Sequence, residues 1–373
     1  MEDRERLDAR AAALVAWLRD TLATSAVRIE PASEDASFRR YFRVRTGSRT
    51  RIAMDAPPPM EDCRPFVSVL GLLRGAGVNA PRLHAADVER GFLLLDDLGS
   101  RCYLDVFEEA GADALYADAF DALIAMQCGI GRGRVPPYDE RRLRDELDLF
   151  RHWFLARHLA IELDEALSHA LGDTFEALVR TCVEQPRVFV HRDYHSRNLM
   201  YLGNGDSGGD PGGGPGGGPG SGTGGDAGGN PGVIDFQDAV DGPVTYDLVS
   251  LLRDVYVRWP EDRVADWVGA YHDRAVARGL VDVGRAQFLR WFDLTGVQRH
   301  LKIAGIFARL WHRDGKPRYL DDLPLTLSYL AQIAPRYPET EAVVRVLEEC
   351  DVASRVHAVR SGVPARPRDG RPR

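Results

Sequence analysis

The stretch that decides the fold covers residues 188–200 and reads V-F-V-H-R-D-Y-H-S-R-N-L-M. Its first three residues are apolar and typical of a strand, and a polar loop that opens with His191 follows them at once. Asn198 stands five residues after Asp193 and precedes a second short apolar pair. The pattern predicts a strand that delivers a polar loop, followed by another short strand.

A second short strand with an acid at its end lies further along the chain, where residues 232–236 read G-V-I-D-F. Between the two stretches lie residues 203–232, and 17 of these 30 residues are glycine. Such a segment cannot bury apolar surface, so we expect a disordered insertion at the tip of a hairpin. A phosphate-cradling loop is the alternative, but such loops are short and lead into a helix. The hairpin would bring Asn198 close to Asp235.

These polar residues are the set that phosphoryl transfer requires. One carboxylate accepts the proton of the acceptor hydroxyl, while an amide oxygen and a second carboxylate hold Mg²⁺ on the nucleotide phosphates. We assign Asp193 as the catalytic base and Asn198 and Asp235 as metal ligands, with His191 bracing the loop through its backbone. The alternative is an ordinary strand turn with solvated acids. The H-R-D-x-x-x-x-N spacing followed by an isolated Asp-Phe resembles the protein-kinase signature.

Composition excludes several other classes of protein. The 373 residues carry 48 basic and 56 acidic side chains, a net charge of −8, which disfavours nucleic-acid binding. Lys302 and Lys316 are the two lysines of the chain, beside 46 arginines. Neither precedes Ser or Thr, so a G-x-x-x-x-G-K-[ST] phosphate loop is excluded. Lysine Schiff-base chemistry is excluded over the first 300 residues as well.

The expected compartment follows from the cysteines and the N-terminus. Five well-separated cysteines without a C-x-x-C favour reduced thiols over a zinc site or disulfides. The charged start M-E-D-R-E-R is unlike a signal peptide, and no apolar run reaches the roughly 18 residues of a membrane span. We expect a cytoplasmic protein with no membrane partner.

Hydrophobic periodicity predicts a strand-rich first part and a helical remainder. Strands are expected at 27–30, 38–45, 50–54 and in the run 91–99, which two acids and a glycine end. Helices are expected at 4–22, 61–75, 104–127, 140–158, 164–184, 245–258, 263–278, 283–312 and 321–349.

The site motifs together resemble the aminoglycoside phosphotransferase/choline kinase branch of the kinase fold, which reads H-x-D-x-H-x-x-N and I-D-F. Four further segments resemble the anomeric N-acetylmuramate/N-acetylglucosamine kinases of bacterial cell-wall recycling. They are A-S-F-R-R-Y-F-R-V at 36–44, M-D-A-P-P at 54–58, L-L-D-D-L-G at 94–99 and Q-R-H-L-K at 298–302. The resemblance runs from about residue 7 to 350 and excludes the glycine-rich segment.

The resemblance implies an α+β, protein kinase-like, two-lobed fold. Residues 1–95 would form a small antiparallel-sheet N-lobe that binds nucleotide, and residues 96–358 a larger, mainly helical C-lobe with the catalytic and substrate residues. The segment 203–232 would be the disordered insertion. Residues 359–373 would form a basic, flexible tail.

The resemblance also places ATP in the cleft, with adenine against residues 95–98. The loop 33–37 would cover the phosphates. Met54 stands where other kinases carry the phosphate-binding lysine, so an arginine must replace it, and Arg43 is the candidate. The expected nucleotide contacts are therefore Ser33, Ser37, Arg43, Met54, Leu95, Asp96 and Leu98. Asp96 and Asp97 could equally be acids that merely end a strand.

For the acceptor, the corresponding helices of relatives suggest that the basic segment 296–318 lines the pocket. That lining would disfavour a polycationic aminoglycoside and suit a neutral amino sugar or one with a carboxylate. A solvated basic helix face is the alternative. The candidate substrate contacts are His195, Arg197, Asp238, Arg299 and Lys302. Asp247 resembles the buried acid that holds the catalytic loop in this fold.

The leading hypothesis is an ATP- and Mg²⁺-dependent kinase, monomeric, that phosphorylates the anomeric hydroxyl of N-acetylmuramate or N-acetylglucosamine in peptidoglycan recycling. A rival of the same class is an aminoglycoside, choline or homoserine kinase. A rival of another class is a nucleotide-binding pseudokinase scaffold. The missing third-strand lysine favours the scaffold, whereas the intact Asp193, Asn198 and Asp235 argue against it.

Overall fold

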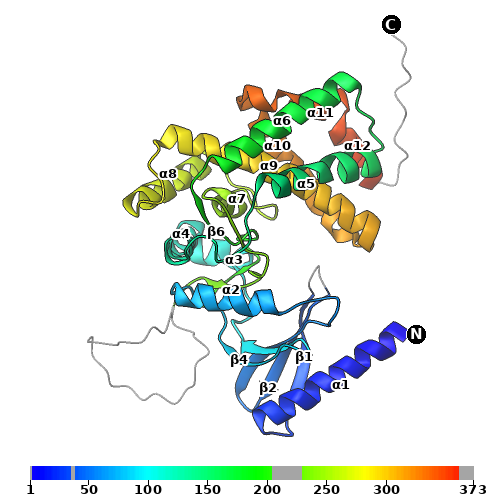
Figure 1. The fold of residues 1–373 in the computed structure, drawn as a ribbon, viewed down its shortest axis with the longest axis vertical. Coiled ribbons are helices and arrows are strands. Elements are labelled where there is room, and N and C mark those ends of the chain that lie inside the picture. The colour runs from blue at the N-terminus through cyan, green and yellow to red at the C-terminus, as the bar shows by residue number, and fades with distance from the viewer. Residues whose placement is uncertain (1, 35–37, 204–228, 361–373) are drawn as a thin grey trace. The chain divides into compact units, whose positions relative to one another are not determined.

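The computed structural model describes residues 2–34, 38–203 and 229–360 (Figure 1). The chain divides into two compact units. The first comprises Met1–Ile130 and Arg197–Ala239, and the second Gly131–Ser196 and Val240–Arg373. The expected lobe boundary at residues 95/96 stays a prediction. The chain passes from the second unit back to the first between Ser196 and Arg197, inside the motif of residues 188–200.

A five-stranded antiparallel sheet forms the body of the first unit. Its order is β1-β2-β3-β5-β4, so β5 lies between β3 and β4. The strands are β1 Arg28–Glu34, β2 Arg40–Thr46, β3 Arg49–Asp55, β4 Leu83–Asp87 and β5 Phe92–Asp96. The antiparallel sheet and the mainly helical remainder confirm the predicted α+β fold class.

The first helix, α1 Glu2–Leu22, closes one face of this sheet. Leu14, Trp17 and Leu18 recur at helical spacing and pack against alternate strand residues, among them Ala53 and Phe92. Helix α2 Arg64–Gly75 follows β3, and its Phe66 contacts Phe236 near the end of the second site motif. The predicted helices and strands of this region are confirmed, with β1 longer than expected.

Strand β4 was missed because its sequence, L-H-A-A-D, carries neither aromatic nor β-branched residues. It forms at the edge of the sheet, paired with β5. The carboxylate of Asp96 holds this edge, accepting hydrogen bonds from the Arg82 backbone nitrogen at 3.0 Å and from His84 Nε2 at 2.6 Å.

The predicted hairpin is confirmed. Strands β7 Leu199–Met200 and β8 Gly232–Val233 pair antiparallel, with Leu199 opposite Val233. The predicted disordered insertion extended too far at its C-terminal end, because residues 229–232 are ordered by side-chain amides. Asn79 Nδ2 donates to the Gly229 carbonyl, and Asn230 Oδ1 accepts from the Leu202 nitrogen, each at 2.8 Å. Residues 204–228 of the insertion lie outside the described residues.

Helices build most of the second unit, around the long helix α9 Arg285–Asp314. Strands β6 Arg187–Val190 and β9 Val240–Pro243 pair beside it in a small separate sheet. The other helices of this unit are α5 Glu140–Leu149, the π-helix Phe150–His158, α6 Glu165–Val183, α7 Tyr246–Leu252, α8 Glu261–Ala277, α10 Leu323–Ile333, α11 Glu341–Glu349 and α12 Val352–Arg360.

Four helix predictions need correction. The one at 104–127 is split into α3 Tyr103–Val106, the π-turn Phe107–Gly111 and α4 Ala112–Gly129. The one at 140–158 becomes π-helical from Phe150 onward. The one at 245–258 ends at Leu252, and the one at 321–349 is interrupted over 334–340, where two prolines each begin a 3₁₀ turn. Helix α12 was missed, and it reaches Arg360 at the start of the expected flexible tail.

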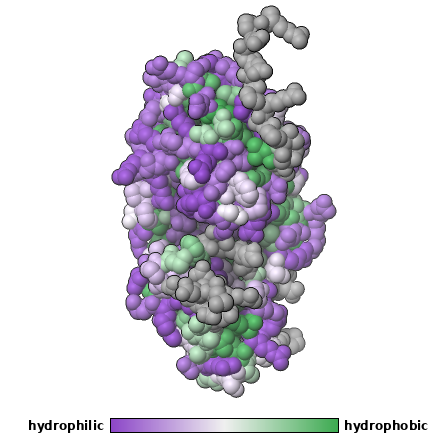
Figure 2. Space-filling model, turned by 90° about the vertical axis from the view of Figure 1, so that its right-hand side faces the viewer, coloured by the Kyte–Doolittle hydropathy of each residue, from purple (hydrophilic) through white to green (hydrophobic). Residues whose placement is uncertain are grey.

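Polar side chains cover much of the face of the protein seen in space-filling view (Figure 2). Figure 2 shows one face, on which hydrophilic side chains predominate and apolar ones gather in separate patches. The large hydrophobic side chains that are exposed among the described residues are Phe38, Met60, Val276 and Trp311. No helix of the described residues is both long and apolar enough to cross a membrane.

Helix α9 approaches the junction between α5 and the π-helix so closely that only glycine fits there. A Cβ added to Gly305 would lie 2.6 Å from the Phe150 nitrogen. We expect Gly305→Ala to lower the free energy of unfolding by about 1–3 kcal/mol through overpacking. Urea unfolding measures the change.

The matched control is Gly71→Ala on α2, where an added Cβ would have no neighbour within 4 Å. This exchange should stabilise the protein by roughly 0.5–1 kcal/mol because alanine is the better helix former. A neutral or stabilising effect of Gly305→Ala would mean that the two elements do not approach in this way.

Candidate active site

The polar loop that follows β6 is held by Asp247, a completely buried residue of α7. Its carboxylate accepts hydrogen bonds from the backbone nitrogens of His191, at 2.6 Å, and Arg192, at 2.9 Å. Burial raises the pKa of Asp247 to about 7, against the opposing effect of the two backbone donors. The prediction that Asp247 holds the catalytic loop is confirmed by these bonds.

A second buried carboxylate, Asp254, holds the other end of the loop. It accepts hydrogen bonds from the backbone nitrogen of Ser196, at 2.9 Å, and from the Ser196 hydroxyl. Asp254 was missed by the sequence reasoning. The sequence offered little signal for it, because Asp254 lies beyond α7, which ends at Leu252, and directly follows the charged Arg253.

The loop between these anchors has an unusual backbone. Arg192 has a φ of +80°, a conformation that residues other than glycine rarely adopt. Its nitrogen bonds to Asp247, and its guanidinium pairs with Glu146 of α5. Contacts on both its backbone and its side chain therefore hold Arg192 in this conformation.

Asp193 follows and presents a partly exposed carboxylate, with 42% of the side chain accessible. His191 Nδ1 accepts a hydrogen bond from the Asp193 nitrogen at 3.3 Å, which joins the first and third residues of the motif. Burial by itself raises the pKa of Asp193, but the positive charges of Arg299 and Lys302 outweigh it and bring the pKa to about 2. The carboxylate is therefore ionised at neutral pH.

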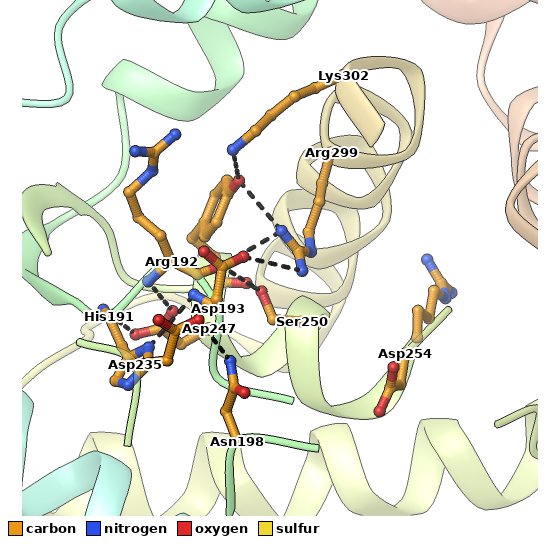
Figure 3. Close-up of polar contacts among 12 residues, drawn as sticks. His191, Arg192, Asp193, Asn198, Asp235, Asp247, Ser250, Asp254, Arg299 and Lys302 are labelled. Carbon is orange, nitrogen blue, oxygen red and sulfur yellow. Dashed lines mark hydrogen bonds and ion pairs between the residues drawn. The ribbon is translucent and has the colours of Figure 1, made fainter. Parts of the chain in front are cut away.

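Arg299 and Lys302, expected as substrate contacts, are buried side chains of α9, with 5% and 4% accessible. Arg299 Nη2 lies 4.0 Å from Asp193 Oδ1, and Lys302 Nζ donates to the hydroxyl of Tyr246 at 2.8 Å (Figure 3). Both cations thus have partners inside the unit. Their burial excludes a solvated helix face for these two residues, whereas their expected place in an acceptor pocket stays a prediction.

The two candidate metal ligands belong to the first unit, where the hairpin brings them together. Asn198 Nδ2 donates to Asp235 Oδ2 at 3.2 Å, and the Ile234 nitrogen donates to the Asn198 carbonyl at 3.1 Å. Asp235 has a φ of +63°, so this residue too is held in an uncommon conformation. Gln237 Nε2 donates to Asp235 Oδ1 at 3.0 Å.

An amide and a carboxylate side by side suit Mg²⁺, which binds through one or two carboxylates and completes its shell with water and phosphate oxygens. Within the described ranges, no group of three or more His, Cys, Asp or Glu side chains could hold a metal ion by itself. The donor set therefore fits a metal that arrives with its nucleotide better than a permanently bound one.

The expected nucleotide contacts differ in their surroundings. Arg43 forms a two-pronged ion pair with Asp97, at 2.7 and 3.1 Å, and donates to the Gly99 carbonyl at 3.0 Å. Met54 and Leu95 are buried in the sheet, and Asp96 holds its edge. Leu98 lies against Gly232, on which an added Cβ would be 3.0 Å from Leu98 Cδ1.

The sequence did not indicate this role of Asp97, which binds Arg43, the arginine expected to contact the nucleotide phosphates. Ser33 lies in β1, opposite Tyr41 just after a break in the register. Ser37 lies outside the described residues.

The remaining candidate substrate contacts border the two motifs. His195 lies edge-on to the ring of Tyr256, with centroids 5.3 Å apart. Arg197 and Asp238 are exposed. Arg197 directly precedes Asn198, and Asp238 follows Asp235 by three residues. Gln237 Nε2 lies 3.4 Å from Asp238 Oδ2.

An antiparallel sheet, a helical unit and an anchored H-R-D loop define the chain as a kinase-like phosphotransferase. Solved structures agree in fold. The ADP-bound aminoglycoside phosphotransferase APH(2'')-Ib superposes with a TM-score of 0.54 at 13% identity, covering 86% of this chain and 98% of that one. Choline kinase LicA from Streptococcus pneumoniae gives a TM-score of 0.57 at 10% identity, covering 85% of this chain and 98% of that one.

The model of the phosphotransferase enzyme family matches residues 28–209 and 225–280, and the chain belongs to this family. An N-acetylmuramate/N-acetylglucosamine kinase of Pseudomonas aeruginosa is 51% identical over 83% of this chain and 84% of its own length. The Pseudomonas putida protein of the same name is 42% identical over 93% of this chain and 98% of its own.

The anchoring role of Asp247 can be tested by removing its acceptors. We expect Asp247→Ala to cost about 2–6 kcal/mol of unfolding free energy, because each of two buried N–H groups left without an acceptor costs about 1–3 kcal/mol. Asp247→Asn keeps one acceptor oxygen and should cost roughly half as much. Urea unfolding measures both.

The exposed Asp282 provides the control, since Asp282→Ala should change stability by no more than about 0.5 kcal/mol. If Asp247→Ala were as mild as Asp282→Ala, the loop would not depend on this carboxylate.

Proposed function

We propose that the chain is an ATP-dependent kinase that phosphorylates the anomeric hydroxyl of N-acetylmuramate and N-acetylglucosamine in peptidoglycan recycling. The observation that carries the proposal is the anchored loop with its ionised Asp193, in a chain 51% identical to a kinase with that name. A small-molecule acceptor, a cytoplasmic location and a monomeric state form part of the same proposal.

In this proposal Asp193 orients the acceptor hydroxyl and takes its proton. A pKa of about 2 makes this carboxylate a weak base, so it accepts the proton only late, once the hydroxyl oxygen has begun to bond to phosphorus. A loose transition state has this property, because little charge develops on the attacking oxygen early in the reaction. Asp193 therefore acts first by orienting the hydroxyl and only then as a base.

Asn198 and Asp235, whose side chains the hairpin brings together, would hold Mg²⁺ through their amide and carboxylate oxygens. When bound, the ion would neutralise the charge of the nucleotide phosphates. His195, Arg197 and Asp238 are the proposed sugar contacts, since they border these residues in the chain and are at least partly exposed. Arg299 and Lys302 stay candidate contacts, but their buried side chains could reach a sugar only by exchanging their present partners.

The third-strand lysine has no direct replacement in this proposal. Arg43 can bind phosphate only by exchanging its bonds to Asp97 for bonds to the nucleotide. Backbone donors of the loop 33–37 would then contribute the remaining contacts to the phosphates.

A substrate panel tests the acceptor. Purified protein is incubated with Mg-ATP and N-acetylmuramate, N-acetylglucosamine, kanamycin, choline or homoserine, and ADP release is followed. We expect turnover with the two amino sugars and none with the polycation. Strong turnover of kanamycin without turnover of the sugars would reject the proposed acceptor, and no turnover of any compound would favour the scaffold alternative.

The role of Asp193 is tested by Asp193→Asn, which keeps the shape of the side chain and removes its charge. We expect kcat to fall by about 10²–10⁴-fold, the usual contribution of a positioned general base. The dissociation constant for ATP, measured by calorimetry, should change little. Undiminished turnover would exclude Asp193 as the base.

A further inference from the structure

Two cationic side chains of helix α9, Lys302 and Arg299, contact the hydroxyl of the same tyrosine, Tyr246. Lys302 Nζ donates to the Tyr246 hydroxyl at 2.8 Å, and Arg299 Nη1 lies 3.4 Å from the same oxygen (Figure 3). The residues are three apart on the helix and so share a face. Buried lysine and arginine side chains are rare unless they are paired, so their common partner calls for an explanation.

The same cations connect to the base of the catalytic loop. Lys302 Nζ lies 3.4 Å from Glu146 Oε2, and Glu146 also pairs with the guanidinium of Arg192. Arg299 Nη1 donates to the Arg192 carbonyl at 3.3 Å. These contacts form a closed ring of residues from α5, the loop, α7 and α9. We call its members the buried ring: Glu146, Arg192, Tyr246, Arg299 and Lys302.

The buried ring contains three cations and one carboxylate, so it is positively charged as a whole. Outside the buried ring, the carboxylate of Asp193 lies 4.0 Å from Arg299 Nη2. Attraction at this distance inside a protein is stronger than in water because the surroundings screen it less. The net positive charge of the buried ring therefore attracts the carboxylate of Asp193, the proposed base.

We propose that Tyr246, Arg299 and Lys302 are positioning residues for the reaction, which hold the Asp193 carboxylate charged and oriented toward the acceptor hydroxyl. The inference rests on the proposed kinase activity and gives these residues a role that acts through Asp193. One of the two lysines of the chain thereby acts behind the base.

The electrostatics of the loop support this role. Charged groups that act on Asp193 include Arg192 and His195 of the loop, Arg299 and Lys302 of α9 and Asp247 of α7. Tyr246 of α7 and Glu146 of α5 lie behind them, in contact with Lys302. Burial favours a raised pKa for Asp193, yet these cations lower it to about 2. They also lower the pKa of Tyr246, which burial by itself would raise.

A purely structural ion network is the competing explanation. Such a network would stabilise the fold without affecting turnover by the folded enzyme. The two explanations differ in kcat, in the pH profile and in the effect of a conservative exchange, so all three are measured.

The first variant is Tyr246→Phe, which removes only the hydroxyl that joins Lys302 to Arg299. We expect kcat to fall by about tenfold, with the KM for ATP and for the sugar within about twofold of the unmodified enzyme. The matched control is Tyr337→Phe, which removes a hydroxyl bonded to Asp293 at 2.7 Å, outside the buried ring. Its kcat should be unchanged. Equal kcat values for Tyr246→Phe and Tyr337→Phe would overturn the proposal.

The second variant is Lys302→Met, which removes one positive charge that lowers the pKa of Asp193. That pKa should rise from about 2 toward its ordinary value of 3.8. Since only the ionised carboxylate is active, the acidic limb of kcat/KM should move to higher pH by about one unit, whereas it should stay in place for Arg345→Met, an exposed helical cation paired with Glu349. Lys302→Arg keeps the positive charge, so its acidic limb should stay close to that of the unmodified enzyme.

Should Lys302→Met fail to fold because Glu146 loses a partner, Glu146→Gln/Lys302→Met removes both charges of the pair, and Tyr246→Phe still tests the phenol. An unshifted acidic limb in a folded Lys302 variant, with kcat unchanged, would leave the buried ring a structural network. Failure of the proposed function is distinguishable, because the unmodified enzyme would then release no ADP with either sugar.

Discussion

The loop that carries Asp193 depends on two buried carboxylates that bond to its backbone. Asp247 accepts from His191 and Arg192 at its start, and Asp254 accepts from Ser196 at its end. Nitrogens that the loop cannot pair within itself thereby find acceptors, which buried backbone requires. A rigid loop in turn allows side chains on α9 to act on Asp193 at a constant distance. The position of Asp193, the proposed base, is therefore determined by the helices α7 and α9 more than by the loop's own sequence.

The sequence was sufficient for the fold class, the hairpin and the pairing of Asn198 with Asp235, because each follows from a local pattern of strand, polar residue and glycine-rich break. It was insufficient where long-range contacts decide. The edge strand β4 forms only because β5 offers a partner. Likewise, nothing in the spacing of Arg299 and Lys302 distinguishes a helix face turned to a pocket from one turned to Tyr246 and Glu146.

The arginine-rich composition has a structural counterpart in both units. In the first unit, Arg10 and Arg40 both bind the buried Asp55, and Arg43 binds Asp97 with both prongs. A planar guanidinium can make two parallel bonds to one carboxylate, which an ammonium cannot. These pairs tie α1 and β2 to β3 and to the segment after β5. Although lysine is scarce, the sheet still carries cations. They are arginines, and each is bound to a particular carboxylate.

The hairpin of β7 and β8 has an evolutionary consequence. The Asn230 bond to Leu202 fixes the open end of the paired strands, and the bond between Asn198 and Asp235, the proposed metal ligands, lies beside the strands themselves. Residues can be added to or lost from the stretch beyond that open end at a cost that grows only slowly, about 0.6 kcal/mol for each doubling of loop length. The length of this stretch can thus vary widely in evolution at little cost in folding free energy.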